Sequence, residues 1–348
     1  MKMYNKISKY DWLNVSLIIF ICGNLYAQTI PTPPQTQQIS KDINSNSKAD
    51  PGDSIRYKVT IQNTGAAPAT AVQLQANTDT RTTLNPSSFR SSPIAVNDGP
   101  YVCTGNVGIN IPAASGVKAN DFDDNLAVAT LSIVTPAASG SVMLNNDGSF
   151  TYTPNAGFTG NDQFTYEITD ATAVVGHTPA SADIRGTVSI TVSNMIWFIS
   201  NISGGSGGTG TRLDPFRTLA DFNASAGTAT GHVVHLQYTG TNYPGGIVLK
   251  NDMRLFGTGH TGGVTLADVL PFVLAPNSPT LPAINGARPV ITNASGDGVI
   301  LADGNTLRGF NVGNCSDFGI ENSGTTTVGN LVVSEVTINN TTGGGFDA

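Results

Sequence analysis

The sequence has little glutamate and few charged residues of any kind. Of its 348 residues, 24 are acidic, and three of these are glutamates (Glu167, Glu321 and Glu335). Charged residues make up 12% of the chain, against about 25% in average soluble domains. Glutamate, lysine and alanine favour helices, whereas aspartate, asparagine and glycine favour turns. The composition therefore argues against helical bundles and doubly wound α/β folds, and with 39 glycines and 19 prolines it favours an all-β protein.

The chain also lacks a strongly basic segment. Its formal net charge is −7, and it contains neither a block of five like charges nor a basic patch interleaved with aromatic residues. Nucleic-acid binding needs such a patch to offset the phosphate charge. We therefore expect no nucleic-acid partner.

Long hydrophobic runs are missing as well. The most apolar stretch, residues 15–22, is shorter than the ~20 residues of a membrane-spanning helix. It follows three lysines and precedes Leu25 and Ala27, which lie three and one residues before a cleavage point at Gln28. This order predicts an export signal at residues 1–27, with an interfacial anchor as the alternative interpretation. We expect a mature chain without a transmembrane segment, located at the cell surface, associated with the outer membrane or extracellular.

Cysteine is scarce. Three are present, and removal of the export signal would leave Cys103 and Cys315, more than 200 residues apart and in different predicted domains. Two lone, part-buried thiols are expected, and a disulfide framework is not.

The first β module is predicted at residues 39–93, after a Pro- and Gln-rich linker at residues 28–38. Apolar and polar residues alternate over residues 54–61, which predicts a strand with one solvent-exposed face. An Asn-Thr-Gly turn follows, and residues 71–75 repeat the alternation. The string PGDSIRYKVTIQNTG resembles the small sandwich modules of large bacterial surface proteins, the DUF11 family. The resemblance implies a β-sandwich.

The second module spans residues 94–193. It contains the strings AVNDGPY, GVKANDFDDN and NNDGSFTYTPNAGFTGNDQFTYEITD. Phe150, Tyr152, Phe164 and Tyr166 alternate with polar residues, which predicts two strands with one buried face. The module resembles the cadherin-like, immunoglobulin-type tandem domain of bacterial surface proteins, and the resemblance covers nearly its whole length. A second β-sandwich is implied.

The third region spans residues 194–348. Its opening, WFISNISGGSGGTGTRLDPFRTLADF, resembles the start of right-handed parallel β-helix (pectin-lyase-like) domains, where a strand leads through a Gly-rich loop to a short capping helix. Phe216, Leu219 and Phe222 are expected to form the apolar face of that helix.

Apolar positions recur beyond this opening. Val299 matches Ile320 at a spacing of 21, and Val312 matches Ile338 at a spacing of 26. Solenoid coils repeat every ~20–50 residues and bury their apolar faces by stacking. Residues 339–348 resemble the turn into another coil, so we expect this region to be the N-terminal part of a truncated β-helix. The predicted fold class is thus all-β, with two β-sandwich modules followed by the start of a right-handed parallel β-helix.

Residues 42–53 space their oxygen-bearing side chains like an EF-hand calcium loop. The candidate ligands are Asp42, Asn44, Asn46, Lys48 (through its backbone carbonyl), Asp50 and Asp53. Hard oxygen ligands wrap one Ca²⁺ in such loops. However, Ser47 replaces the usual turn glycine, the last acid is Asp in place of Glu, and no helices flank the segment. The alternative is a polar loop whose side chains bond to their own turns, and both interpretations stay open.

A second, weaker calcium candidate lies in the second module. Its residues are Asn97, Asp98, Asp121, Asp123 and Asp124. The strings VNDGP and NDFDD resemble the interdomain linker and the Asp-x-Asp loop of cadherins, and this resemblance implies calcium. The acidic loop is shortened here, which favours the alternative of solvated turn carboxylates. Calcium is the one cofactor that the sequence suggests.

Catalytic signatures are absent from the sequence. Many β-helices are polysaccharide lyases or hydrolases, and hydrolysis uses paired carboxylates. The residues with suggestive spacing are Asp297, Asp303, Arg308 and Asp317, and each also fits a solenoid turn. His232 and His235 are three residues apart in a predicted strand, so they should face opposite ways and share no zinc. We expect no catalytic residue.

These expectations define two competing functions. The favoured one is an exported structural or adhesion protein whose sandwich spacers present a β-helix to an unknown surface ligand, protein or glycan. The alternative is a β-helical polysaccharide lyase or glycoside hydrolase with accessory sandwich modules.

Overall fold

The computed structural model describes six strand backbones between residues 2 and 84. It describes in full residues 93–123, 126–169, 184–261, 263–322, 324 and 328–347. The fold is all-β, as the composition predicts. Across these residues no helix has the length and apolar character needed to cross a membrane. The chain forms two compact units: residues 1–95, 121–130 and 168–185 make the first, and residues 96–120, 131–167 and 186–348 make the second.

The first unit contains two antiparallel arrangements of strands. Its strands are β1 (Lys2–Ile7), β2 (Ser16–Ile21), β3 (Gln35–Lys41), β4 (Ser54–Val59), β5 (Val72–Asn77) and β6 (Thr82–Leu84). One sheet has the order β3-β4-β1-β6, and β2 pairs with β5. The strand predicted at residues 54–61 contains β4, and the one predicted at 71–75 overlaps β5. Because β1 and β2 lie inside residues 1–27, signal cleavage stays a prediction.

Two sheets build the sandwich of the second module. Its strands are β7 (Asp98–Gly105), β8 (Ile109–Ile111), β9 (Thr130–Thr135), β10 (Gly140–Leu144), β11 (Phe150–Pro154), β12 (Gly160–Thr169) and the first part of β13 (Arg185–Ile199). One sheet has the antiparallel order β10-β11-β8, and in the other β13 lies between β12 and β7. Two short 3₁₀ turns, η2 (Ala113–Ser115) and η3 (Val117–Ala119), follow β8.

Aromatic side chains fill the sandwich. Phe150, Tyr152, Phe164 and Tyr166 are each at most 1% exposed, which confirms the alternation expected from the sequence. The rings of Phe150 on β11 and Phe164 on β12 meet edge to face, with centroids 5.4 Å apart. Since these strands belong to different sheets, this contact joins the two layers.

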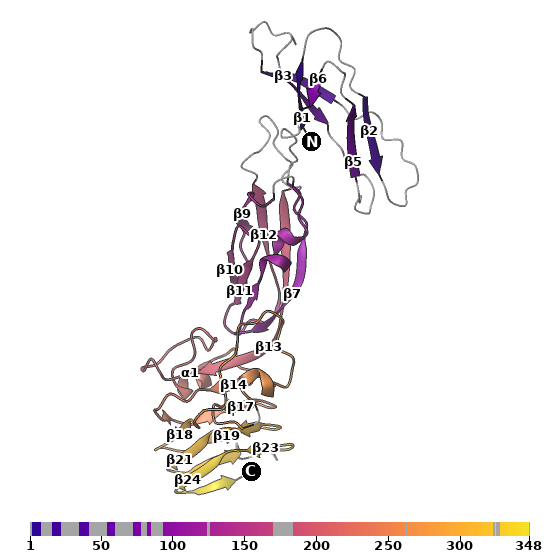
Figure 1. The fold of residues 1–348 in the computed structure, drawn as a ribbon. Helices are drawn as coiled ribbons and strands as arrows, with labels where there is room; N and C mark the ends of the chain where they lie inside the picture. The colour runs from indigo at the N-terminus through magenta and orange to yellow at the C-terminus, as the bar shows by residue number, and fades with distance from the viewer. Residues whose placement is uncertain are drawn as a thin grey trace. The chain divides into compact units, whose positions relative to one another are not determined.

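The rest of the second unit is a solenoid of parallel strands. Its elements after β13 are α1 (Leu219–Ala224), β14 (Val233–Leu236), β15 (Tyr243–Pro244), β16 (Ile247–Val248), β17 (Arg254–Gly257), η4 (Leu266–Val269), β18 (Val290–Thr292), β19 (Val299–Leu301), β20 (Thr306–Arg308), β21 (Asn311–Cys315), β22 (Phe318–Asn322), β23 (Val332–Ser334), β24 (Thr337–Thr341) and β25 (Gly344–Asp347). They form three parallel ladders, β13-β14-β17-β20-β23, β15-β18-β21-β24 and β16-β19-β22-β25. From β14 onward the chain visits the ladders in turn, so each round adds one strand to each, and Figure 1 shows these strands stacked.

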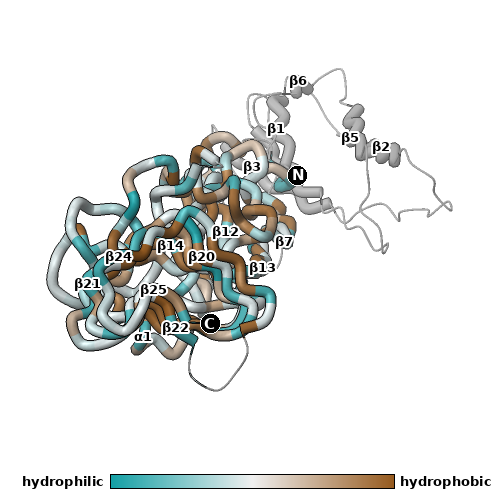
Figure 2. Tube along the Cα trace, turned by 90° about the horizontal axis from the view of Figure 1, so that it is seen from below, coloured by the Kyte–Doolittle hydropathy of each residue, from teal (hydrophilic) through white to brown (hydrophobic). Residues whose placement is uncertain are grey.

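The strand register follows the predicted spacings. Val299 lies opposite Ile320 and Val312 lies opposite Ile338, as the spacings of 21 and 26 require. Inward apolar residues of successive coils form one continuous core. In Figure 2 hydrophobic stretches follow the strands near β14, β20 and β22. The segment expected to turn into another coil, residues 339–348, contains the end of β24 and all of β25, which pair with β21 and β22 of the preceding coil.

One buried asparagine fixes a turn of this stack. Asn305 is fully buried, and its side chain donates to the backbone oxygens of Lys250 at 2.8 Å and Met253 at 3.3 Å. Its Oδ1 accepts a hydrogen bond from the backbone N of Ala302 at 2.7 Å. Because a tight turn leaves backbone groups without ladder partners, a buried amide here satisfies them across neighbouring coils.

Candidate functional site

The strand β13 carries the chain from the sandwich into the solenoid without a break. Its first part, up to Met195, pairs in parallel with β7, and its last part, Ile196 to Ile199, pairs in parallel with β14. The boundary predicted between residues 193 and 194 therefore falls inside a strand. The sandwich and the solenoid therefore share one strand.

Both faces of β13 are buried where it enters the solenoid. Met195, Trp197 and Ile199 belong to the solenoid core, whereas Ile196 and Phe198 belong to a second apolar cluster. Side chains alternate between the faces of a strand, so neighbouring residues enter different clusters. Burial on both faces is typical of parallel strands that are covered on each side.

The second cluster is covered by residues 258–289, which we call the excursion. This segment leaves the solenoid after β17 and returns at β18. Its Leu266, Leu281 and Ile284 are buried in the cluster together with residues of β13, β14 and β17. Val107, from the turn between β7 and β8 of the sandwich, is buried in the same cluster. The excursion therefore packs on the solenoid and on the end of the sandwich.

Hydrogen bonds fix the excursion to the sandwich. The backbone N of Asn110 donates to the backbone oxygen of Asn277 at 2.8 Å. The backbone N of Ala275 donates to Oγ1 of Thr104 at 3.2 Å, and Thr104 is buried.

Asn106 supplies two more bonds at the same end of the sandwich. Its backbone oxygen accepts from the backbone N of Arg212 at 2.9 Å, and its Oδ1 accepts from the backbone N of Gly157 at 2.8 Å. Its φ of 65° lies in the left-handed region, which asparagine enters more readily than most residues. Arg212 follows the Gly-rich loop, so this loop too is tied to the sandwich.

Trp197 fills the start of the solenoid core. Its ring stacks on Phe216, with centroids 5.4 Å apart and planes at 18°, and its Nε1 donates to Nδ1 of His232 at 3.0 Å. Leu219 and Phe222 of α1 are buried beside it, which confirms the predicted apolar face. Phe216 precedes the helix and is also buried.

The two histidines of the β14 region contact opposite faces of β13, as their spacing predicts. His232 bonds to Trp197 in the core, whereas the His235 ring lies 6.1 Å from the Phe198 ring in the second cluster. Burial lowers the pKa of His235 to about 4, so the imidazole is neutral at pH 7.

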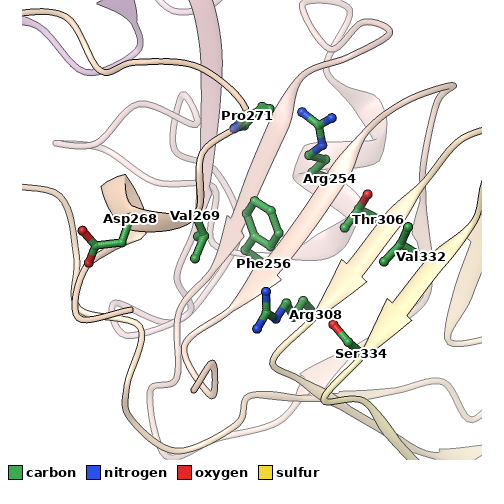
Figure 3. A pocket seen from close by; sticks show the side chains of 9 residues that line it. All are labelled: Arg254, Phe256, Asp268, Val269, Pro271, Thr306, Arg308, Val332 and Ser334. Carbon is green, nitrogen blue, oxygen red and sulfur yellow. The ribbon is translucent and has the colours of Figure 1, made fainter. Parts of the chain in front are cut away.

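A pocket of about 390 Å³ opens on the outer face of the β17-β20-β23 ladder, as Figure 3 shows. Its floor consists of alternate, outward-facing residues of these strands: Arg254, Phe256, Thr306, Arg308, Val332 and Ser334. Asp268, Val269 and Pro271 of the excursion form a wall. We call this concavity the outer-face pocket.

Glu335 links the solenoid to the start of the excursion beside this pocket. Its carboxylate accepts from Nε of Arg308 at 2.9 Å, from the backbone N of Thr261 at 3.2 Å and from the Thr261 hydroxyl. The Thr261 hydroxyl and Arg308 hold the pKa of Glu335 below its ordinary value. Nδ1 of His260 lies 4.0 Å from the carboxylate, and burial and Arg308 lower the pKa of that histidine. Near neutral pH the carboxylate is therefore charged and the imidazole is neutral.

The first calcium candidate, residues 42–53, lies outside the described residues, so it stays a prediction. The second candidate divides between the units: Asn97 and Asp98 belong to the second, Asp121 and Asp123 belong to the first, and Asp124 is not described. Oδ1 of Asn97 accepts from the backbone N of Thr187 at 2.8 Å. Within the described part of the chain, no three His, Cys, Asp or Glu side chains gather as a metal site would require.

The residues with catalytic spacing lie at different points of a coil. Arg308 lines the outer-face pocket, whereas Asp303 lies in the turn before β20, where its backbone oxygen accepts from Asp252. Oδ1 of Asp297 accepts from the backbone N of Phe318 at 2.9 Å. Asp317 precedes β22.

Both cysteines of the described residues are free and buried, as expected. Burial raises the pKa of Cys103 to about 12 and also raises that of Cys315. Such thiols stay protonated and are poor nucleophiles.

The geometry defines an all-β chain in which a sandwich continues into a parallel solenoid. Residues 90–194 match the model of a family described as bacterial cadherin-like domain. This span contains β7 to β12 and most of β13, in agreement with the second predicted module. No curated protein and no solved structure matches the chain. A cadherin-like module, of a kind typical of extracellular proteins, is therefore present at residues 90–194.

Proposed function

We propose that the chain is an exported bacterial surface protein in which the cadherin-like sandwich acts as a rigid spacer for a right-handed β-helix. The continuity of β13 supports this proposal most directly. Linked domains normally move relative to each other unless their interface is large and apolar. Here a bend at the junction would break ladder hydrogen bonds and expose the second apolar cluster. A stiff joint suits a protein that holds a binding or structural surface away from its anchor.

The role of the solenoid in this proposal is structural or adhesive. Stacked coils present extended, repetitive outer faces, which solenoid proteins use for binding. Its partner would be a surface protein or a glycan. No catalytic residue is assigned.

The N-terminal part completes the proposal. Residues 1–27 direct export, and residues 39–93 form a second, DUF11-like spacer. The basic start and short apolar run support export, and the alternation at residues 54–61 supports the module. Antibodies against the solenoid should label intact source cells and the label should disappear after external protease treatment. Labelling only after lysis would contradict export.

Insertion of a flexible linker tests the rigid joint. Four Gly-Ser residues inserted between Ser193 and Asn194 should split the unfolding of the second unit into two transitions, because the shared strand no longer couples its halves. The matched control is the same insertion at Gly240, where an added Cβ would meet open space. Scanning calorimetry distinguishes the cases. Two transitions of the second unit already present in the unmodified chain would refute the spacer role.

Calcium is a separate part of the proposal. The oxygen spacing of residues 42–53 supports it, and the net charge of −7 makes cation binding favourable. A ligand that binds only the folded state must raise its stability. Millimolar Ca²⁺ should therefore raise the Tm of the full chain and EDTA should lower it, with Asp42→Asn/Asp53→Asn as the matched variant. An unchanged Tm in Ca²⁺ would exclude the metal.

A pair of neighbouring carboxyl groups, those of Glu321 and Asp297, supports a second candidate function, glycan cleavage. Glu321 on β22 has a raised pKa because of a hydrogen bond to Asp297 and the nearby charges of Asp297, Asp317 and Asp347. Glycosidases use two neighbouring carboxyl groups, one as the general acid and the other as base or nucleophile. Release of reducing ends from acidic and neutral polysaccharides, abolished in Glu321→Gln, would favour this candidate. Activity unaffected by that substitution would remove these residues from it.

A further inference from the structure

The outer-face pocket contains an arginine whose guanidinium is not paired with any carboxylate of the described residues. Of the two arginines in its floor, Arg308 is paired with Glu335 at 2.9 Å. The backbone N of Arg254 donates to the backbone oxygen of His232 at 3.1 Å, whereas its guanidinium makes no hydrogen bond or ion pair with any described residue. The acid in the pocket wall, Asp268, uses Oδ2 to accept from the backbone N of Val264 and Thr265, each at 2.8 Å. The lining therefore holds a guanidinium with free donors beside a second, singly paired one.

The strand register brings the two arginines to one place. Arg254 lies opposite Thr306, and Phe256 lies opposite Arg308, so the arginines are on neighbouring strands and one outward position apart. A strand spacing of about 4.8 Å and a two-residue advance of about 6.6 Å put their Cα atoms roughly 8 Å apart. Figure 3 shows both side chains at the same concavity, on either side of Phe256. Two arginine side chains at this separation can reach one anion.

The remaining lining selects the kind of anion. The hydroxyls of Thr306 and Ser334 line the floor, and Phe256 and Pro271 supply apolar surface. Guanidinium groups bind both carboxylates and phosphates through two parallel hydrogen bonds, and the hydroxyl and apolar lining favours an organic acid over a bare phosphate ion. A volume of about 390 Å³ lies in the range of small-molecule sites.

From these contacts we infer that the outer-face pocket binds a small hydroxylated organic carboxylate. Its carboxylate lies between Arg254 and Arg308, and its body lies against Thr306, Ser334 and Phe256. This site goes beyond the proposed spacer role, which needs no ligand here. If no carboxylate binds in the pocket, the proposal of a rigid joint between sandwich and solenoid still stands.

Calorimetric titration of the full chain tests the site, with glucuronate as the probe and glucose as its uncharged match. Glucuronate should bind at least tenfold more tightly than glucose. Arg254→Gln should lower the affinity for glucuronate about tenfold or more, since a charge-assisted pair of hydrogen bonds is lost. Arg217→Gln makes the same charge change outside the pocket, at a side chain that donates to the backbone oxygen of Ser206. That control should leave the affinity unchanged.

Two further comparisons separate charge from shape. Arg254→Lys keeps the charge but loses the planar fork, so it should bind glucuronate more weakly than the parent chain. Full affinity in Arg254→Lys would overturn the bidentate pairing, and equal affinity for inorganic phosphate would overturn the choice of a carboxylate. Equal affinities for glucose and glucuronate, or an unchanged glucuronate affinity in Arg254→Gln, would overturn the proposed site. An unchanged Tm of each variant shows that it is folded.

Discussion

His235 couples the stability of the solenoid to pH. Its side chain is fully buried beside Phe198 of the second apolar cluster, and neither ring nitrogen makes a hydrogen bond of normal geometry. A weaker contact with the Phe256 backbone raises the pKa, but burial outweighs it. Burial disfavours the charged form and lowers the pKa of His235 to about 4. We predict that acid weakens the fold through this residue and that His235→Leu removes the effect.

The size of the effect follows from the two pKa values. Between pH 6.5, the ordinary histidine pKa, and about pH 4, the unfolded chain binds a proton that the folded chain does not. The free energy of unfolding therefore decreases as the pH falls through this window. At about 1.4 kcal/mol for each pH unit, the full loss is about 3 kcal/mol, and it is complete below pH 4. At pH 7 the unpaired imidazole is neutral and costs about 1 kcal/mol.

Urea unfolding measures this difference. Trp12 and Trp197 are the two tryptophans of the chain, so a Trp12→Phe background leaves Trp197, which is buried where the solenoid begins, as the reporter. His235→Leu should be about 1 kcal/mol more stable than the parent at pH 7, and the gap should widen to roughly 4 kcal/mol at pH 4. All other titrating groups are common to both chains and cancel. A gap that stays constant between pH 7 and pH 4 would refute the reasoning.

Four other substitutions have definite expected outcomes. Asn305→Ala removes hydrogen bonds that cross neighbouring coils, and it should lower the free energy of unfolding in urea by about 2–3 kcal/mol; a loss below about 1 kcal/mol would contradict the role of the buried amide. Gly210→Ala places a Cβ at a φ of 77° against the rings of Trp197 and Phe216, so it should lower the free energy of unfolding by about 1–3 kcal/mol and shift the Trp197 emission. Gly204→Ala is the control, because its φ of 62° is also in the left-handed region but its Cβ would meet open space. It should lower the free energy of unfolding by about 1 kcal/mol and leave the emission unchanged. Glu335→Gln should lower the free energy of unfolding by about 1 kcal/mol at pH 7 and low salt, because the ion pair with Arg308 is lost. Because the folded pKa of Glu335 is lowered, the parent loses this advantage as the pH falls below the ordinary glutamate range, and the urea midpoints of parent and variant should converge in acid.

The sequence predicts those parts of the fold that depend on local periodicity. The two-residue alternation of Phe150, Tyr152, Phe164 and Tyr166 is a property of each strand by itself, and their burial follows it. The spacing between Val299 and Ile320 likewise determines their pairing, because stacked coils must bring equivalent apolar positions into register.

The junction and the pocket depend on information that periodicity does not carry. The sequence pattern changes near residue 194 because different side chains cover β13 on either side of that point. The strand itself continues past residue 194, so the predicted boundary falls inside it. Nothing in the local sequence distinguishes Arg254 from the other arginines. Only the register shows that Arg254 and Arg308 face one concavity. The wall residues, Asp268 and Pro271, come from a segment with no repeat at all.

The excursion connects these features physically. Its apolar residues cover the second cluster, and the backbone of Ala275 and Asn277 holds it to the sandwich. Between these two attachments, residues 268–271 form the wall of the outer-face pocket. A pocket wall must be held in place for its lining to select a ligand, because a mobile wall adds an entropic cost to binding. The contacts that stiffen the joint between sandwich and solenoid therefore also hold the pocket in shape. A substitution that loosens the joint should weaken glucuronate binding, even though it touches no residue of the pocket.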